Sequence, residues 1–139
     1  MNFYLSLFPG SRITQMARYG EAGPGVKGSV MSIGFELDGR EFAALNGGPV
    51  FHFNEAVSFL IWCDTQAEID RLWDKLVAGG TVLACGWVKD RFGLAWQINY
   101  AGLRDMLASP DAAAADRAMQ AMMTMQKIDI ATIDRAYRG

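Results

Sequence analysis

The chain has 139 residues, of which 13 are Lys or Arg and 15 are Asp or Glu, so its formal net charge is −2. Hydrophobic residues make up 51% of the chain, which excludes an intrinsically disordered protein, and the length predicts one domain. The near-neutral charge argues against a dedicated nucleic-acid-binding protein, which usually carries a clustered basic face. No apolar run is long enough for a transmembrane helix, and the first residues lack the features of a signal peptide. We therefore expect a cytoplasmic protein that binds neither nucleic acid nor a membrane.

The first residues predict a short helix and then a strand. Apolar residues recur at helical spacing over 2–8, and Pro9-Gly10 ends this segment. We expect a strand over 11–19 and a mobile glycine-rich loop over 20–28. A glycine-rich loop can hold a phosphate where it opens onto a helix N-terminus. Because the segment that follows resembles a strand, phosphate binding is disfavoured here.

A hairpin is predicted next. Residues 29–37 alternate between polar and apolar side chains, which is typical of a strand with one buried face. Asp38-Gly39 favours a tight two-residue turn, since both positions tolerate a positive φ. The returning strand is expected over 40–46 and ends at Gly47-Gly48-Pro49.

The second half of the chain begins with a nearly continuous apolar run, 56–63, which predicts a central strand buried on both faces. Thr65 and Glu68 have the spacing of a capping box. They predict the start of a helix over 66–78 with one apolar stripe, ended by Gly79-Gly80.

Two further strands, 81–88 and 92–100, are expected after this helix. Between them, Lys89 and Asp90 are predicted to lie in a turn and to form a surface ion pair, which would stabilise the fold little. The expected order is a helix, three strands, a further strand, a helix and then two or three strands. This order corresponds to two copies of a βαβββ pattern, with the first strand of the first copy absent.

The last 38 residues predict helices over 102–108, 110–126 and 128–138, with Ser109 as N-cap and Pro110 as the first helical residue of the second helix. Met and Ala residues between Ala118 and Met123 form an apolar stripe. Such a stripe suits either a core or an adaptable dimer interface.

The cysteines and the histidine do not predict a metal centre. Cys63 and Cys85 are expected to be buried thiols, because disulfides are unusual in a reducing cytosol. Two separated cysteines and one histidine do not supply a usual zinc site. His52 lies in an aromatic segment, where it is either structural or a residue at the mouth of a pocket that acts as an acid, a base or a ligand donor.

Several ordered blocks of the sequence resemble a known family. Examples are Asn-Phe-Tyr-Leu-Ser-Leu-Phe-Pro at 2–9 and Ala-Leu-Asn-Gly-Gly-Pro at 44–49. The other blocks are 18–25, 35–42, 63–70, 85–93, 96–98 and 121–130. Together they resemble the PhnB-like branch of the vicinal oxygen chelate superfamily, which comprises glyoxalases, bleomycin-resistance proteins and dioxygenases. Members of this branch often carry the label 3-demethylubiquinone-9 3-methyltransferase-like.

The resemblance implies an α+β fold, with paired βαβββ modules that form a cupped mixed sheet and with a C-terminal helical extension. On this basis we expect one domain over 1–139, with module one at about 1–48, module two at about 49–100 and helices at about 101–139. Relatives carry a further strand before the block at 2–9, so the first strand is missing here. The resemblance also implies a homodimer, in which a partner chain could cover the edge left unpaired.

The superfamily's metal enzymes bind a divalent ion through four side chains on the first and last strands of the two modules. The first of these positions falls in the missing strand, and the others fall near Ala44–Asn46, at Ser58 and at Gln97. Because Ser, Asn and Gln are weak ligands for such an ion, we expect no catalytic metal and no other cofactor. The residues expected to bind a ligand are Asn46, His52, Ser58, Trp62, Trp87, Trp96 and Gln97, although each tryptophan is also suited to a place in the core.

These observations favour a small-molecule-binding protein without a catalytic metal. The alternative is a metal-dependent lyase, isomerase or dioxygenase that acts on a small oxygenated substrate. A methyltransferase, as the family label suggests, is a distant third interpretation. A methyltransferase of the Rossmann type needs alternating strands and helices and a glycine-rich first turn, and this chain is too short and has a different pattern.

Overall fold

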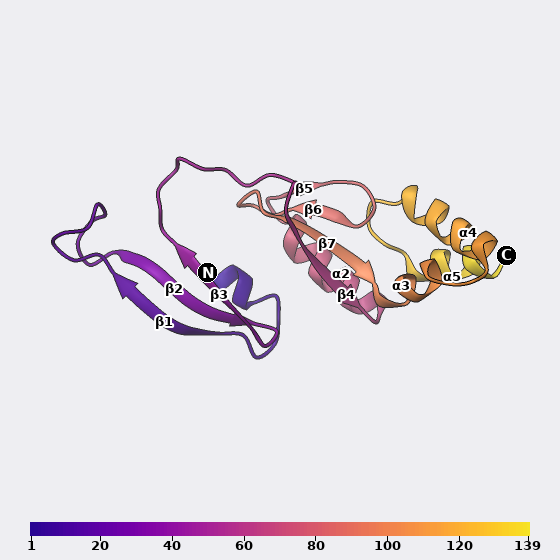
Figure 1. Cartoon of the computed structure of the whole chain (residues 1–139), viewed down its shortest axis with the longest axis horizontal. Coiled ribbons are helices and arrows are strands. Elements are labelled where there is room, and N and C mark those ends of the chain that lie inside the picture. Colours follow the sequence, from indigo (N-terminus) through magenta and orange to yellow (C-terminus); the bar gives the residue numbers. More distant parts are fainter. The chain divides into compact units, whose positions relative to one another are not determined.

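The chain folds into two units, Met1–Phe51 and His52–Gly139, and the structure, a computed structural model, describes residues 1–139 (Figure 1). Each unit combines helix with β-sheet, so the fold is mixed α+β, as predicted. No helix in the structure has the length and apolar character needed to cross a bilayer.

The first unit consists of one short helix and an antiparallel sheet with the strand order β1-β2-β3. Its elements are α1 (Asn2–Leu5), β1 (Arg12–Arg18), β2 (Val30–Leu37) and β3 (Arg40–Leu45). The predicted hairpin between β2 and β3 is confirmed, since Asp38 and Gly39 have φ angles of 48° and 73°. This backbone conformation is the one that a tight two-residue turn requires at both positions.

The alternation predicted for β2 is also confirmed in the first unit. Phe35 and Leu37 are buried and, with Leu7, form its small core, whereas Gly34 and Glu36 lie on the other face of the sheet. In β1 the register shifts between Ile13 and Gln15, so the alternation is interrupted there by a bulge.

The second unit contains a complete βαβββ module. Its elements are β4 (Ser58–Cys63), α2 (Gln66–Val77), β5 (Thr81–Val82), β6 (Trp87–Lys89) and β7 (Ala95–Tyr100). The strand order is β4-β7-β6-β5, in which β4 pairs with β7 in parallel and the other pairs are antiparallel. A parallel pair needs a long crossover, and here α2 and the β5–β6 hairpin supply it.

The predicted capping box is confirmed at the start of α2. The backbone N–H of Glu68 donates to the hydroxyl of Thr65 at 3.2 Å, and the Glu68 carboxylate accepts from the backbone N–H of Thr65 at 3.3 Å. Four residues of the apolar stripe of α2 are buried: Ile69, Leu72, Trp73 and Leu76. The helix contacts β4, β6 and β7 and so covers one face of the sheet.

The prediction that residues 56–63 form a central strand buried on both faces is wrong. The strand β4 lies at an edge of the sheet, and Phe59, Leu60 and Trp62 are 38%, 43% and 40% exposed. A continuous apolar run signals two covered faces in a parallel sheet, but here α2 covers one face only.

The single strand predicted over 81–88 is broken in the structure. Cys85 and Gly86 have positive φ angles, and their backbone N–H groups donate to the carbonyl oxygens of Met125 and Gln126. Because these donors pair with the C-terminal segment, the chain leaves the sheet between β5 and β6.

The turn between β6 and β7 differs from the predicted surface ion pair. Asp90 is buried, and its carboxylate accepts hydrogen bonds from the backbone N–H groups of Phe92 and Leu94 and from the indole N–H of Trp96. Lys89 instead pairs with Glu55, with 2.7 Å between Nζ and Oε1. The turn is therefore built by a buried carboxylate that binds three donors.

The C-terminal helices α3 (Ala101–Leu107), α4 (Ala112–Met123) and α5 (Ile130–Arg138) belong to the second unit. The N-cap of α4 is Asp111, which accepts from Ala114, so the prediction of Ser109 as N-cap is wrong. The side chain of Gln66 binds both the carbonyl oxygen of Ile128 and the N–H of Ile130. These bonds connect the start of α2 to the start of α5.

Candidate functional site

The two faces of the sheet in the second unit differ in what covers them. Side chains of paired residues in neighbouring strands point to the same face, so the register divides the strands into two sets. One set includes Phe59, Val88, Trp96 and Ile98, and its members on β6 and β7 are buried beneath α2. The opposite set contains Ala95 and Asn99, which are buried, and six residues that are partly or fully exposed. We call these six the open face: Ser58, Leu60, Trp62, Trp87, Lys89 and Gln97.

The open face consists of rows that run across the strands. In one row Leu60 of β4, Gln97 of β7 and Trp87 of β6 lie side by side. In the next row Trp62 pairs with Asn99. Leu60 and Trp62 are both at least 40% exposed, so the face presents apolar and aromatic surface around the amide of Gln97.

A hydrogen bond orients the polar centre of this face. Gln97 donates from Nε2 to Oγ of Ser58 at 2.8 Å. The two residues lie on paired strands, and both are partly buried. Because Nε2 is engaged in this bond, the carbonyl oxygen of Gln97 remains as an acceptor of defined position.

A cation lies at each end of the open face. At one end the guanidinium of Arg104, on α3, lies over the ring of Trp62 at 5.7 Å from its centroid, a cation–π geometry. At the other end Lys89 binds Glu55. The hydrogen bond from Lys89 lowers the pKa of the Glu55 carboxyl. The positive charge of Lys89 is therefore balanced by the negative charge of Glu55.

The structure brings four of the seven predicted ligand-binding residues together on the open face: Ser58, Trp62, Trp87 and Gln97. Trp96 lies on the opposite face, is 3% exposed and donates to Asp90 at 3.0 Å. His52 is exposed in the segment that precedes β4. Asn46 follows β3 in the first unit, where its side-chain amide donates to the carbonyl oxygen of Val30 at 3.3 Å.

Three residues of this surface, Leu60, Lys89 and Arg104, were not among the predicted ligand-binding residues. Leu60 could have been found from the period of two in β4, because it lies between Ser58 and Trp62 on the same face. The same rule shows that Trp96 and Gln97, as neighbours in one strand, point to opposite faces. No sequence signal indicated Arg104, since its place over Trp62 depends on how α3 packs.

The residues at the expected metal positions do not fit a divalent ion. Ser58 and Gln97 bind each other, and the amide of Asn46 binds backbone. No group of three or more His, Cys, Asp or Glu side chains in the chain could hold an ion. Neutral hydroxyl and amide donors without an imidazole or carboxylate are a weak set for such metals, so these side chains are better suited to hydrogen bonding than to metal coordination.

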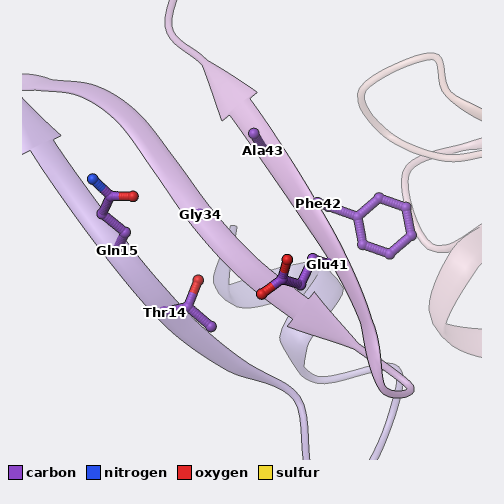
Figure 2. A pocket seen from close by; sticks show the side chains of 6 residues that line it. All are labelled: Thr14, Gln15, Gly34, Glu41, Phe42 and Ala43. Carbon is purple, nitrogen blue, oxygen red and sulfur yellow. The ribbon is translucent and has the colours of Figure 1, made fainter.

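A separate hollow of about 390 Å³ lies in the first unit, on the face of its sheet that carries Gly34. Figure 2 shows Thr14, Gln15 and Glu41 around Gly34, whereas the ring of Phe42 points away. A Cβ at position 34 would lie 3.0 Å from the hydroxyl of Thr14 and 3.3 Å from Cβ of Gln15. Because a Cβ there would crowd both side chains, Gly34 allows Thr14 and Gln15 to approach β2 closely. No pattern in the sequence indicated this hollow.

Comparison with known proteins identifies the family. The family model described as 3-demethylubiquinone-9 3-methyltransferase matches residues 1–99. A solved Bacillus cereus PhnB protein that carries the same methyltransferase name is 37% identical, with a TM-score of 0.67, over 73% of this chain and 88% of that one. A protein from Pseudomonas aeruginosa is 23% identical, with a TM-score of 0.58, over 71% of this chain and 84% of that one, and so shares the fold. No curated protein matches. The chain belongs to the PhnB-type 3-demethylubiquinone-9 3-methyltransferase-like family.

Proposed function

We propose that the open face of the second unit binds a small apolar or aromatic molecule, without a catalytic metal. The observation that carries the proposal is the alignment of Leu60, Gln97 and Trp87 in one row beside Trp62, on the face opposite α2. Small-molecule sites are mostly apolar and contain a few fixed polar groups. The open face has this composition, with the hydrogen-bonded pair of Ser58 and Gln97 as its polar centre.

The energetics favour a ligand with a planar ring. Tryptophan side chains bury a large area on contact and stack on other rings. Covering apolar surface contributes about 25 cal/mol per Å², so a ligand that covers about 100 Å² of this face gains about 2.5 kcal/mol before the cost of association. The carbonyl oxygen of Gln97 would accept one hydrogen bond from the ligand and fix its orientation.

The family supports the same class of function. The fold and the sequence blocks resemble the vicinal oxygen chelate superfamily, whose bleomycin-resistance members sequester a compound without chemistry. The methyltransferase name of the family finds no support in the chain, which lacks the alternating strands and helices of a Rossmann-type cofactor site.

Calorimetric titration with a panel of small aromatic compounds tests the proposal. We expect at least one compound to bind the wild-type chain and to bind Trp87→Leu at least fivefold more weakly. Phe92→Leu removes a 53% exposed ring in the β6–β7 turn and serves as the matched control, with unchanged affinity. Equal affinities of the wild type and Trp87→Leu would contradict the proposal.

The metal-dependent alternative is tested by metal content. Protein purified without chelator should contain less than one tenth of an equivalent of Ni, Zn, Mn or Fe. A stoichiometric amount of metal that survives dialysis, together with metal-dependent turnover of a small oxygenated substrate, would contradict the proposal. The protein would then be a metal-dependent enzyme.

A further inference from the structure

We propose that the ligand of the open face is an aromatic anion whose charged group is bound by Arg104. This inference rests on the proposed function, since it names the class of molecule that the same face takes. The cations at the two ends of the face differ, because an acidic side chain neutralises Lys89 but not Arg104.

Arg104 carries an unmatched positive charge. It is exposed on α3, its guanidinium lies over Trp62, and it takes part in no salt bridge anywhere in residues 1–139. A guanidinium over a ring keeps its N–H donors, which lie in the plane of the group, available to other acceptors. Such donors can bind a carboxylate or another planar oxyanion through two hydrogen bonds at once.

The rest of the face favours an anion over a cation. Its other cation, Lys89, is paired with Glu55 at 2.7 Å, and no Asp or Glu is among the residues that define the open face. A cationic ligand would approach Arg104 without a carboxylate to receive it. A ligand anion would instead supply the countercharge that this arginine lacks.

The spacing suits a ligand of two fused rings. Trp62 pairs with Asn99, and Gln97 lies two residues earlier on the same strand and face. Alternate residues of a strand are about 7 Å apart, so a ring over Leu60 and Trp87 can direct a carboxylate toward Arg104. The face is thereby divided into an aromatic part and an anion-binding part.

The test is a calorimetric comparison of 2-naphthoate with 2-naphthamide, which has the same ring system without the charge. We expect wild-type chain to bind 2-naphthoate at least fivefold more tightly. Arg104→Gln should weaken 2-naphthoate about tenfold, as expected for loss of a charge-assisted hydrogen bond, and 2-naphthamide less than twofold. Arg104→Lys should lie between these values, because lysine keeps the charge and loses the planar fork.

Matched variants separate this inference from the proposed function. Arg40→Gln, an exposed arginine of the first unit, makes the same charge change and should leave both affinities as they are. If both compounds bind equally and Arg104→Gln affects them equally, the anion inference is wrong while binding at the open face stands. If neither compound binds, the inference is wrong, and the proposed function is decided by the wider panel of aromatic compounds. If both compounds bind and Trp87→Leu leaves both affinities unchanged, the proposed function fails and the inference fails with it.

Discussion

The two units contain related sheets that differ by one strand. In the second unit β7 pairs with β6 on one side and with β4 on the other. In the first unit β3 is the counterpart of β7, because each is the second strand of a hairpin, yet β3 pairs only with β2. The difference shows what a parallel strand and its helical crossover add to the module.

The second unit also contains most of the hydrophobic core. Of 17 buried hydrophobic residues, only Leu7, Phe35 and Leu37 lie in the first unit. The other 14 lie in the second unit, where α2 packs on the sheet and α3, α4 and α5 pack on one another. The first unit therefore has little buried apolar area to offset the entropy of ordering its chain, and its amide hydrogens should exchange faster.

The largest expected effect concerns assembly. An unpaired strand edge can pair with another chain. Two apolar side chains are also largely exposed: Leu45 on β3 is 71% exposed, and Met123 on α4 is 61% exposed. We propose that a second copy of this chain covers such surface, and we expect a homodimer at low micromolar concentration. Light scattering should give about twice the mass of 15.3 kDa, and a monomeric mass would contradict the proposal.

Core truncations should separate the two units. Leu76 on α2 and Leu7 in the first unit are both fully buried. Leu76→Ala should lower the free energy of unfolding by about 3 kcal/mol, because it leaves a cavity in the larger core. Leu7→Ala should mainly speed hydrogen exchange in β1–β3.

Urea unfolding and hydrogen exchange measure these effects. Leu60→Ala, at a 43% exposed position of the open face, is the control for Leu76→Ala and should cost less than about 1 kcal/mol. Equal losses for the buried and the exposed leucine would contradict the assignment of the two faces.

The buried turn should be the next most sensitive feature. Asp90→Ala removes the acceptor of three hydrogen bonds, including that of the Trp96 indole. Leaving these donors unsatisfied should cost about 2 kcal/mol, as measured by urea unfolding. Asp74→Ala, an exposed position on α2, should change stability by less than about 0.5 kcal/mol. A neutral effect of Asp90→Ala would show that water replaces the carboxylate.

A smaller effect is expected from Cys63 at high pH. Burial raises the pKa of this thiol from 9.0 to about 11, because it disfavours the thiolate. A group whose pKa is raised in the folded state stabilises the fold below its unfolded pKa and loses this contribution as the pH rises. Wild-type stability should therefore fall between pH 9 and 11 more steeply than that of Cys63→Ala, and parallel curves would contradict this.

Local patterns predicted the elements whose determinants are close in sequence. Thr65 with Glu68 and Asp38 with Gly39 predicted the start of α2 and the β2–β3 hairpin, because a few neighbouring residues decide both. The open face was predicted in part: Ser58, Trp62, Trp87 and Gln97 were chosen, and Trp96 was included although period two puts it on the face opposite Gln97.

Features that depend on distant partners were not predictable in this way. The exposure of β4 depends on which face α2 covers, and the break before β6 depends on hydrogen bonds to Met125 and Gln126. The position of Arg104 over Trp62 depends on the packing of α3. Each of these needs a contact between segments that are far apart along the chain.

Binding at the open face can be tested with the indole N–H signals of the four tryptophans in a two-dimensional NMR titration with 2-naphthoate. Trp62 and Trp87 lie on the open face, whereas Trp73 and Trp96 are buried on the other side of the sheet. Binding at the open face predicts saturable shifts of the Trp62 and Trp87 signals with little change in the other two. Saturable binding that leaves the Trp62 and Trp87 signals unshifted would contradict binding at the open face.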